Sequence, residues 1–193
     1  MAGARIEITK DTARPALKRA IAQLEGEGRE LMLADIGEYL LRSTRERGAR
    51  QVDPSGAPWR PLSEDYKKWK QKKRPGVPIL KFDFHMLGDQ LSYQVDSDAL
   101  YVGTNAPYGA VHQFGHTFER KARKQELFFH RDRGGEVGNL FVKKRKSNFA
   151  QTVDVGAHQA TVAARPWLGL SDEDHDEVLA IAADHLAAMF GAG

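Results

Sequence analysis

The chain has 193 residues, no cysteine, 28% charged residues and a formal net charge of +3. This length is enough for one domain with a hydrophobic core, and the lack of cysteine excludes disulfides, thiol catalysis and cysteine-ligated zinc. No apolar run approaches the ~18–20 residues of a membrane span, and the first residues hold no apolar stretch of the signal-peptide type, so we expect a soluble protein without a membrane partner.

The charges are segregated along the chain. Residues 60–81 carry eight basic and two acidic residues, and residues 119–147 carry ten basic and four acidic residues. Residues 82–118 contain four acidic residues, residues 171–193 contain six, and neither segment contains Lys or Arg. Blocks of opposite sign favour contacts between copies of the chain, or with charged neighbours, although any single block also fits a solvated face.

The N-terminal part predicts a short strand and then helices. Residues 6–9 alternate in polarity, and Asp11 or Thr12 can cap a first helix, which glycines near residue 26 weaken. Apolar residues at helical spacing continue to about residue 47, and Gly48 is the expected C-cap.

A lysine-rich helix is predicted after a turn-rich loop over residues 52–61. Ser63 is its expected cap, and it ends before Pro75. Trp69 lies among the lysines. We interpret it as the apolar anchor of this helix, and the alternative is a ring that stacks on a nucleic-acid base.

The middle of the chain predicts strands. Residues 91–95 and 100–103 have the pattern of a hairpin, and a short helix follows over residues 108–114, ended by Gly115. Residues 126–130 and 139–143 are expected to pair as a second hairpin with a basic tip, and residues 152–155 and 160–162 are further strand candidates.

The last helix has the clearest signals. Ser171 and Asp174 have capping-box spacing, and an apolar face follows at positions 178, 181, 182, 185, 186 and 189. We therefore predict an α+β fold in one domain over residues 1–193. It has N-terminal helices, a central antiparallel sheet, a protruding basic hairpin arm at about residues 119–147 and a C-terminal amphipathic helix.

The sequence gives little support for catalysis. His112 and His116 have the spacing of zinc hydrolases, but no Glu follows His112 and no third ligand is apparent. Four aspartates between residues 83 and 98 can be read as a magnesium site, but a hairpin turn explains Asp96 and Asp98 better. We expect no enzyme activity, no metal and no cofactor.

Clusters of basic residues are candidates for contact with DNA or with a protein partner. Contact with DNA would be electrostatic and independent of base sequence. The residues are Lys67, Lys68, Lys70, Lys72, Lys73, Arg120, Lys121, Arg131, Arg133, Lys143, Lys144, Arg145 and Lys146.

Three further motifs resemble the phage virion morphogenesis family, the tail-completion proteins of Mu-like and related tailed phages. The first holds Gly56, Trp59, Pro61 and Leu62, the second runs from Tyr108 to Gly115, and the third runs from Ala163 to Gly169. Gly109 and Ala163 depart from the usual Ala and Pro of the family. A fourth element, residues 87–91, matches imperfectly.

The resemblance implies a structural protein of the virion neck, assembled in the host cytoplasm as a closed ring, with six copies as the expected number. The ring would join the DNA-filled head to the tail and would contact neighbouring connector or head-completion and tail-terminator proteins. The alternative is a basic DNA-binding protein without sequence preference. The residues expected to brace the subunit or its interface are Trp59, Tyr108, His112, Gln113, Arg165, Pro166 and Trp167.

Overall fold

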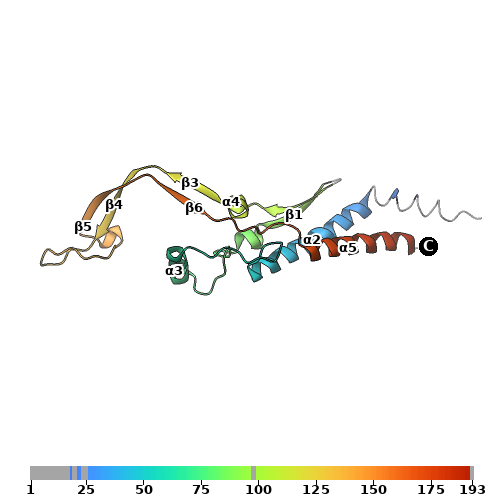
Figure 1. Cartoon of the computed structure of the whole chain (residues 1–193), viewed down its shortest axis with the longest axis horizontal. Coiled ribbons are helices and arrows are strands. Elements are labelled where there is room, and N and C mark those ends of the chain that lie inside the picture. Colours follow the sequence, from blue (N-terminus) through green and yellow to red (C-terminus); the bar gives the residue numbers. More distant parts are fainter. Residues whose placement is uncertain (1–17, 19–20, 23–25, 97–98, 192–193) are drawn as a thin grey trace, which may run out of the picture. The chain divides into compact units, whose positions relative to one another are not determined.

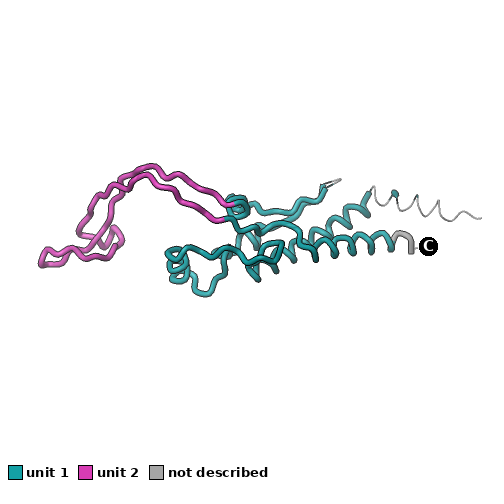
Figure 2. The backbone as a smooth tube through the Cα atoms, in the orientation of Figure 1, with its two compact units in different colours: residues 1–114, 164–193 teal, residues 115–163 magenta. Residues whose placement is uncertain are grey.

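The computed structural model describes residues 18, 21–22, 26–96 and 99–191. The strand expected over residues 6–9 and most of the first helix lie outside these residues. The chain forms two compact units (Figure 2): unit 1 comprises residues 1–114 and 164–193, and unit 2 comprises residues 115–163. Helices and antiparallel strand pairs are both present (Figure 1), so the predicted α+β class is confirmed.

Unit 1 is built on the long helix α2, Glu27–Arg50. Helix α5, Asp172–Gly191, and the hairpin β1–β2 pack against α2. The hairpin strands are Leu91–Asp96 and Ala99–Thr104, and they pair antiparallel as the predicted hairpin, with Tyr93 opposite Val102. The shorter elements of unit 1 are α3 (Glu64–Lys73), the π-helical turn η1 (His85–Asp89) and α4 (Gly109–Phe114).

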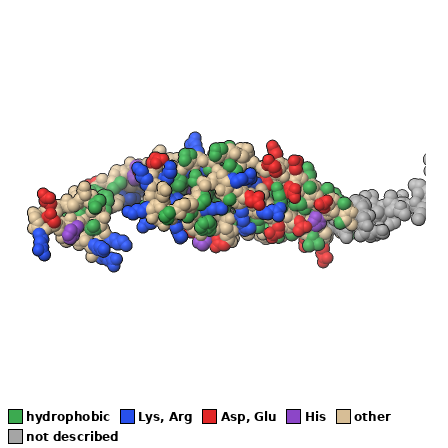
Figure 3. Space-filling view, turned by 90° about the horizontal axis from the view of Figure 1, so that it is seen from below, with side chains coloured by type: hydrophobic (Ala, Val, Ile, Leu, Met, Phe, Trp, Pro, Cys, Tyr) green, Lys and Arg blue, Asp and Glu red, His purple; other side chains and the backbone are tan. Residues whose placement is uncertain are grey.

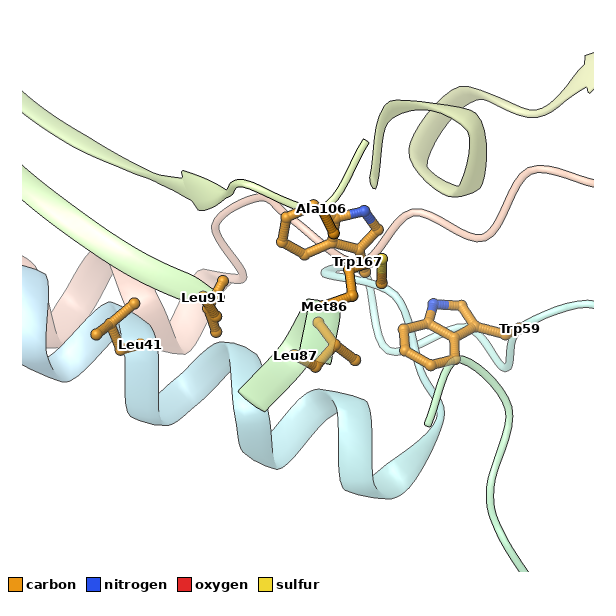
Figure 4. Close-up of a cluster of buried hydrophobic side chains, with 7 residues drawn as sticks. All are labelled: Leu41, Trp59, Met86, Leu87, Leu91, Ala106 and Trp167. Carbon is orange, nitrogen blue, oxygen red and sulfur yellow. The ribbon is translucent and has the colours of Figure 1, made fainter. Parts of the chain in front are cut away.

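The core of unit 1 draws side chains from α2, η1, β1 and three loops, which supply Trp59, Ala106 and Trp167. Both indole rings of the cluster lie beside the aliphatic residues (Figure 4). Because burial of apolar surface is the main favourable term in folding, this cluster fixes where the loops around it run. Its buried members are Leu41, Trp59, Met86, Leu87, Leu91, Ala106 and Trp167.

Gly48 does not end its helix, contrary to the prediction. Helix α2 continues to Arg50, and Gln51 takes the left-handed conformation of the C-cap with φ of 60°. Gly48 is buried instead, and a Cβ on it would lie 2.9 Å from Cδ1 of Leu87. The absence of a side chain at Gly48 therefore allows α2 and η1 to pack closely.

Unit 2 consists of two antiparallel strand pairs and a connecting segment. Strand β3 (His116–Arg120) pairs with β6 (His158–Val162), and β4 (Arg123–Phe129) pairs with β5 (Phe149–Val155). Together with β1–β2, the described residues form three separate two-stranded sheets. The residues predicted to form the arm all lie within unit 2.

The predicted pairing of residues 126–130 with residues 139–143 is wrong. Strand β4 takes β5 as its partner, in a register that places Phe129 opposite Phe149. The residues between them are organised locally: Arg131 bridges to Val137, and a short 3-10 turn, η2, spans Lys144–Lys146. The side chain of Asn148 holds both the N–H and the C=O of Arg131, at 2.6 and 2.7 Å, and so ties the segment after β4 to the segment before β5.

Candidate functional site

Three segments that are far apart in the sequence meet beside the core of unit 1. They are residues 58–62, residues 109–114 and residues 164–170, and the core close-up shows two of their side chains, Trp59 and Trp167 (Figure 4). These are the segments that carry the sequence motifs. We call their meeting point the brace; its members are Trp59, Gln113, Arg165, Pro166 and Trp167.

The two tryptophans of the brace are buried and each has a main-chain partner. Trp59 Nε1 donates to the carbonyl oxygen of Pro166 at 2.7 Å, and Trp167 Nε1 donates to that of Gly109 at 3.0 Å. A buried indole needs a partner for its N–H, since an unpaired polar group inside a protein is costly. Each ring therefore fills core volume and fixes the position of a second segment.

Arg165 joins the other two segments of the brace. Its guanidinium donates to the carbonyl oxygens of Arg60 at 2.7 Å and Pro61 at 2.9 Å, and its backbone N–H donates to His112 O at 2.7 Å. The side chain is buried, so these bonds act where water competes little.

Gln113 closes the brace from α4. Its Oε1 accepts from the backbone N–H groups of Trp167 at 2.9 Å and Leu168 at 3.0 Å, and its Nε2 donates to Leu168 O at 2.9 Å. The amide thus replaces a strand neighbour for residues that have no sheet partner. Both ends of the Gln113 amide, Oε1 and Nε2, therefore bind backbone groups.

Gly109 explains one departure from the expected motif. A Cβ at this position would lie 2.6 Å from Thr104 Cγ2 and 3.6 Å from the ring of Trp167. Alanine therefore requires the neighbouring threonine to shift. In this chain the glycine lets α4 start directly against β2.

Tyr108 and His112 lie next to the brace and border a cavity of about 220 Å³ in unit 1. Their rings make an edge-to-face contact with centroids 5.9 Å apart. Nδ1 of His112 is buried and has no hydrogen-bond partner. Burial, with a smaller effect of the nearby Arg165 charge, lowers the pKa of His112, so the ring is neutral near pH 7.

The cavity beside His112 is a poor cation site. Lys70 and Arg165 line it together with one imidazole and one carboxylate, Asp83, and the two cations repel a metal ion. His116 does not share a helical face with His112, because α4 ends at Phe114 and His116 begins β3. Among the described residues, no three His, Asp or Glu side chains are grouped as a metal ion requires.

Lys70 is not on the surface, contrary to the prediction that grouped it with the exposed lysines. It is the one buried residue of α3, only 4% exposed, and its ammonium donates to the carbonyl oxygen of Pro78. Desolvation, and to a lesser extent the charge of Arg165, lowers its pKa. Lys67, Lys68, Lys72 and Lys73 are exposed as expected.

Trp69 is not the buried anchor of α3, which corrects a second interpretation. It is 46% exposed and stacks between Tyr66, at 5.3 Å between ring centroids, and Phe82, at 5.5 Å. The next residue, Lys70, points inward, and the indole of Trp69 remains half exposed to solvent.

The basic residues of unit 2 are all exposed. Three of them lie over aromatic rings of the same unit: Arg120 over Phe118, Arg131 over Phe149 and Lys144 over Phe128. The other basic candidates of this unit are Lys121, Arg133, Lys143, Arg145 and Lys146.

A buried ion pair between Arg47 and Asp174 was not predicted. The capping-box spacing of Ser171 and Asp174 is confirmed, with bonds of 2.9 and 3.2 Å between them. The carboxylate of Asp174 also binds Arg47 of α2. Desolvation raises the pKa of Asp174, but hydrogen bonds from Ser171 and Ser43 and the Arg47 charge outweigh it, so the pKa lies below the ordinary value. The sequence does not single out Arg47, which is one of five arginines in α2.

The profile of the phage virion morphogenesis family matches residues 8–187 of the chain. No curated protein and no solved structure matches the chain. Among the described residues, no helix combines the length and apolar character needed to cross a membrane.

Proposed function

The chain belongs to the phage virion morphogenesis family, and we propose that it is a structural protein of the head–tail junction that assembles into a closed ring. A role in building the phage virion follows from the family. The position at the neck, the ring and the absence of enzyme activity are our proposal.

The brace is the observation that supports a structural role. Its polar groups are directed at backbone carbonyls and N–H groups, as with Trp59 on Pro166 and Gln113 on Leu168. A catalytic site needs nucleophiles, acids or bases that are free to reach a substrate. In this chain, the polar side chains of the brace bind backbone groups instead and hold three segments together.

The distribution of charge supports a ring. A closed ring is built from heterologous contacts, so each subunit needs two different surfaces that fit one another. The exposed lysines of α3 form one such surface, and the exposed acids of α5 form another of opposite sign. Figure 3 shows many acidic side chains, with basic ones between them, over the part of unit 1 that contains the long helices.

Particles produced without this protein test the proposal. Negative-stain imaging is expected to show DNA-filled heads and separate tails, because the junction lacks one of its rings. Supplying the protein from a plasmid should restore joined particles. Intact, infectious particles in its absence would overturn the junction role.

A basic DNA-binding protein is a second candidate, favoured by the exposed basic side chains of unit 2. Contact through Lys143, Lys144, Arg145 and Lys146 would neutralise phosphates and release counterions. The affinity for short duplex DNA would then fall steeply with added salt and would not depend on base sequence. An affinity that is weak at low salt, or insensitive to salt, excludes this candidate.

A further inference from the structure

We infer that the aromatic and basic face of α3 binds the acidic face of α5 on a neighbouring copy of the chain. The aromatic stack is defined as Tyr66, Trp69 and Phe82, and the acidic face as Asp176, Glu177, Ala180 and Asp184. The inference rests on the proposed ring and specifies which two surfaces build it.

The aromatic stack is ordered and half exposed. The planes of Trp69 and Phe82 are nearly parallel, at 10°, and those of Tyr66 and Trp69 are inclined by 29°. Tyr66 is 44% exposed. Because stacking already fixes these rings, a partner that covers them gains apolar contact without ordering loose side chains, which is typical of the residues that dominate interfaces.

Positive charge surrounds the stack. Lys72 and Lys73 follow Trp69 by three and four residues, so they share its side of the helix. The guanidinium of Arg74 lies 5.7 Å from the ring centroid of Phe82. A partner for this surface must therefore combine negative charge with apolar atoms that can approach flat rings.

Helix α5 offers this combination on its outer side. The members of the acidic face recur at spacings of one, three and four residues and are exposed, while Val178 and Ile181 are half-buried. Within the described part of the chain, none of the three acids in this face forms a salt bridge. The small side chain of Ala180 leaves room for a ring to approach between carboxylates.

A second copy is favoured over DNA because both surfaces belong to the same chain. Every subunit then presents one basic and one acidic surface, which meets the requirement of a heterologous ring. Duplex DNA would match the lysines, but it would leave the acids of α5 without a partner.

Introduced cysteines test the pairing, since the chain has none of its own. Variants with Lys72→Cys, Ala180→Cys or both are incorporated into particles and treated with a bismaleimide cross-linker. The double variant is expected to give a ladder of covalent oligomers, and a mixture of the two single variants should give dimers. Each single variant alone should give none, because a heterologous contact does not place two copies of one position together.

A charge exchange supplies the matched control. The pair Asp176→Lys with Glu177→Lys should lower the cross-linking yield about tenfold, and Lys73→Glu with Arg74→Glu on the opposite copy should restore it. Dimers from a single-cysteine variant, or no dimers from the mixture, would overturn the inference.

A photoreactive residue at position 69 identifies which molecule covers the aromatic stack. Trp69→p-benzoylphenylalanine, irradiated in assembled particles, should give an adduct with α5 of another copy; an adduct with DNA or a different virion protein overturns the inference. If tails remain joined but no cross-link forms between α3 and α5, the proposed ring stands and the proposed α3–α5 interface is wrong. If the junction of the particles lacks the protein, the ring and the interface are both wrong.

Discussion

Arg47 on α2 and Asp174 on α5 form an ion pair that is withdrawn from water, with 3% and 1% of the two side chains exposed. The same carboxylate accepts hydrogen bonds from Tyr39 and Ser43 of α2 and from the backbone N–H of Ser171. A single aspartate therefore caps α5 and attaches it to α2. The orientation of the last helix, and of the acidic surface that it carries, depends on this group.

Replacing Asp174 with asparagine is expected to destabilise the protein by about 3–5 kcal/mol, because Arg47 remains buried without its counter-charge. Urea unfolding of the purified protein measures the loss. Asp176→Asn, an exposed position on the same helix, is the control and should change the unfolding free energy by less than about 0.5 kcal/mol. Equal losses in the two variants would contradict this account.

Gln113→Leu tests the brace. The substitution removes the acceptor shared by the N–H groups of Trp167 and Leu168, and an unpaired buried N–H costs about 1–3 kcal/mol. We expect a loss of this size in the unfolding free energy and fewer joined particles when the variant replaces the natural protein. Gln71→Leu, on the exposed surface of α3, should be nearly neutral. A fully stable Gln113→Leu protein would show that the brace does not hold the fold.

Two glycines are expected to respond in opposite directions to alanine. A Cβ at Gly37 would lie 2.6 Å from ring carbons of Tyr93, so Gly37→Ala should cost about 1–3 kcal/mol despite the better helix propensity of alanine. A Cβ at Gly103 meets no atom within 4 Å, so Gly103→Ala should be neutral or stabilising by up to about 1 kcal/mol. Thermal unfolding of both variants checks the signs.

Two histidines are expected to titrate on opposite sides of the ordinary value of 6.5. Burial lowers the pKa of His112, with a further contribution from Arg165, while the hydrogen bond and charge of Asp89 raise the pKa of His85. The stability supplied by neutral His112 is therefore present above about pH 6.5 and is lost as the pH falls through its lower folded value. NMR titration of the two imidazoles measures both; the reverse order would contradict the burial of His112.

The periodic elements were predictable because their signals are local. The α5 cap and the β1–β2 hairpin follow from Ser171 with Asp174 and from the alternation over residues 91–103. The partner of β4 was not predictable in the same way, because residues 149–155 are further along the chain than residues 139–143. Residues 126–130 do touch the intervening segment, since Phe128 O accepts from the N–H of Val142 at 2.9 Å, but the contacts there are isolated and form no ladder.

The residues of the brace were identified from their motifs, but their contacts were not. The family resemblance predicted that Trp59 and Trp167 brace the subunit or its interface, whereas their specific carbonyl partners depend on the tertiary fold. Lys70 and Trp69 show the limit of the hydrophobic pattern. A lysine can turn inward when a carbonyl oxygen meets its ammonium, and a tryptophan can remain half exposed when neighbouring rings stack on it.

The most direct test of the central claim is a cryo-electron microscopy reconstruction of the head–tail junction of the virion, made without imposed symmetry. The account predicts a closed ring of this fold between the head and the tail, with α3 of each copy against α5 of the next. A junction that contains no copy of this chain would contradict it.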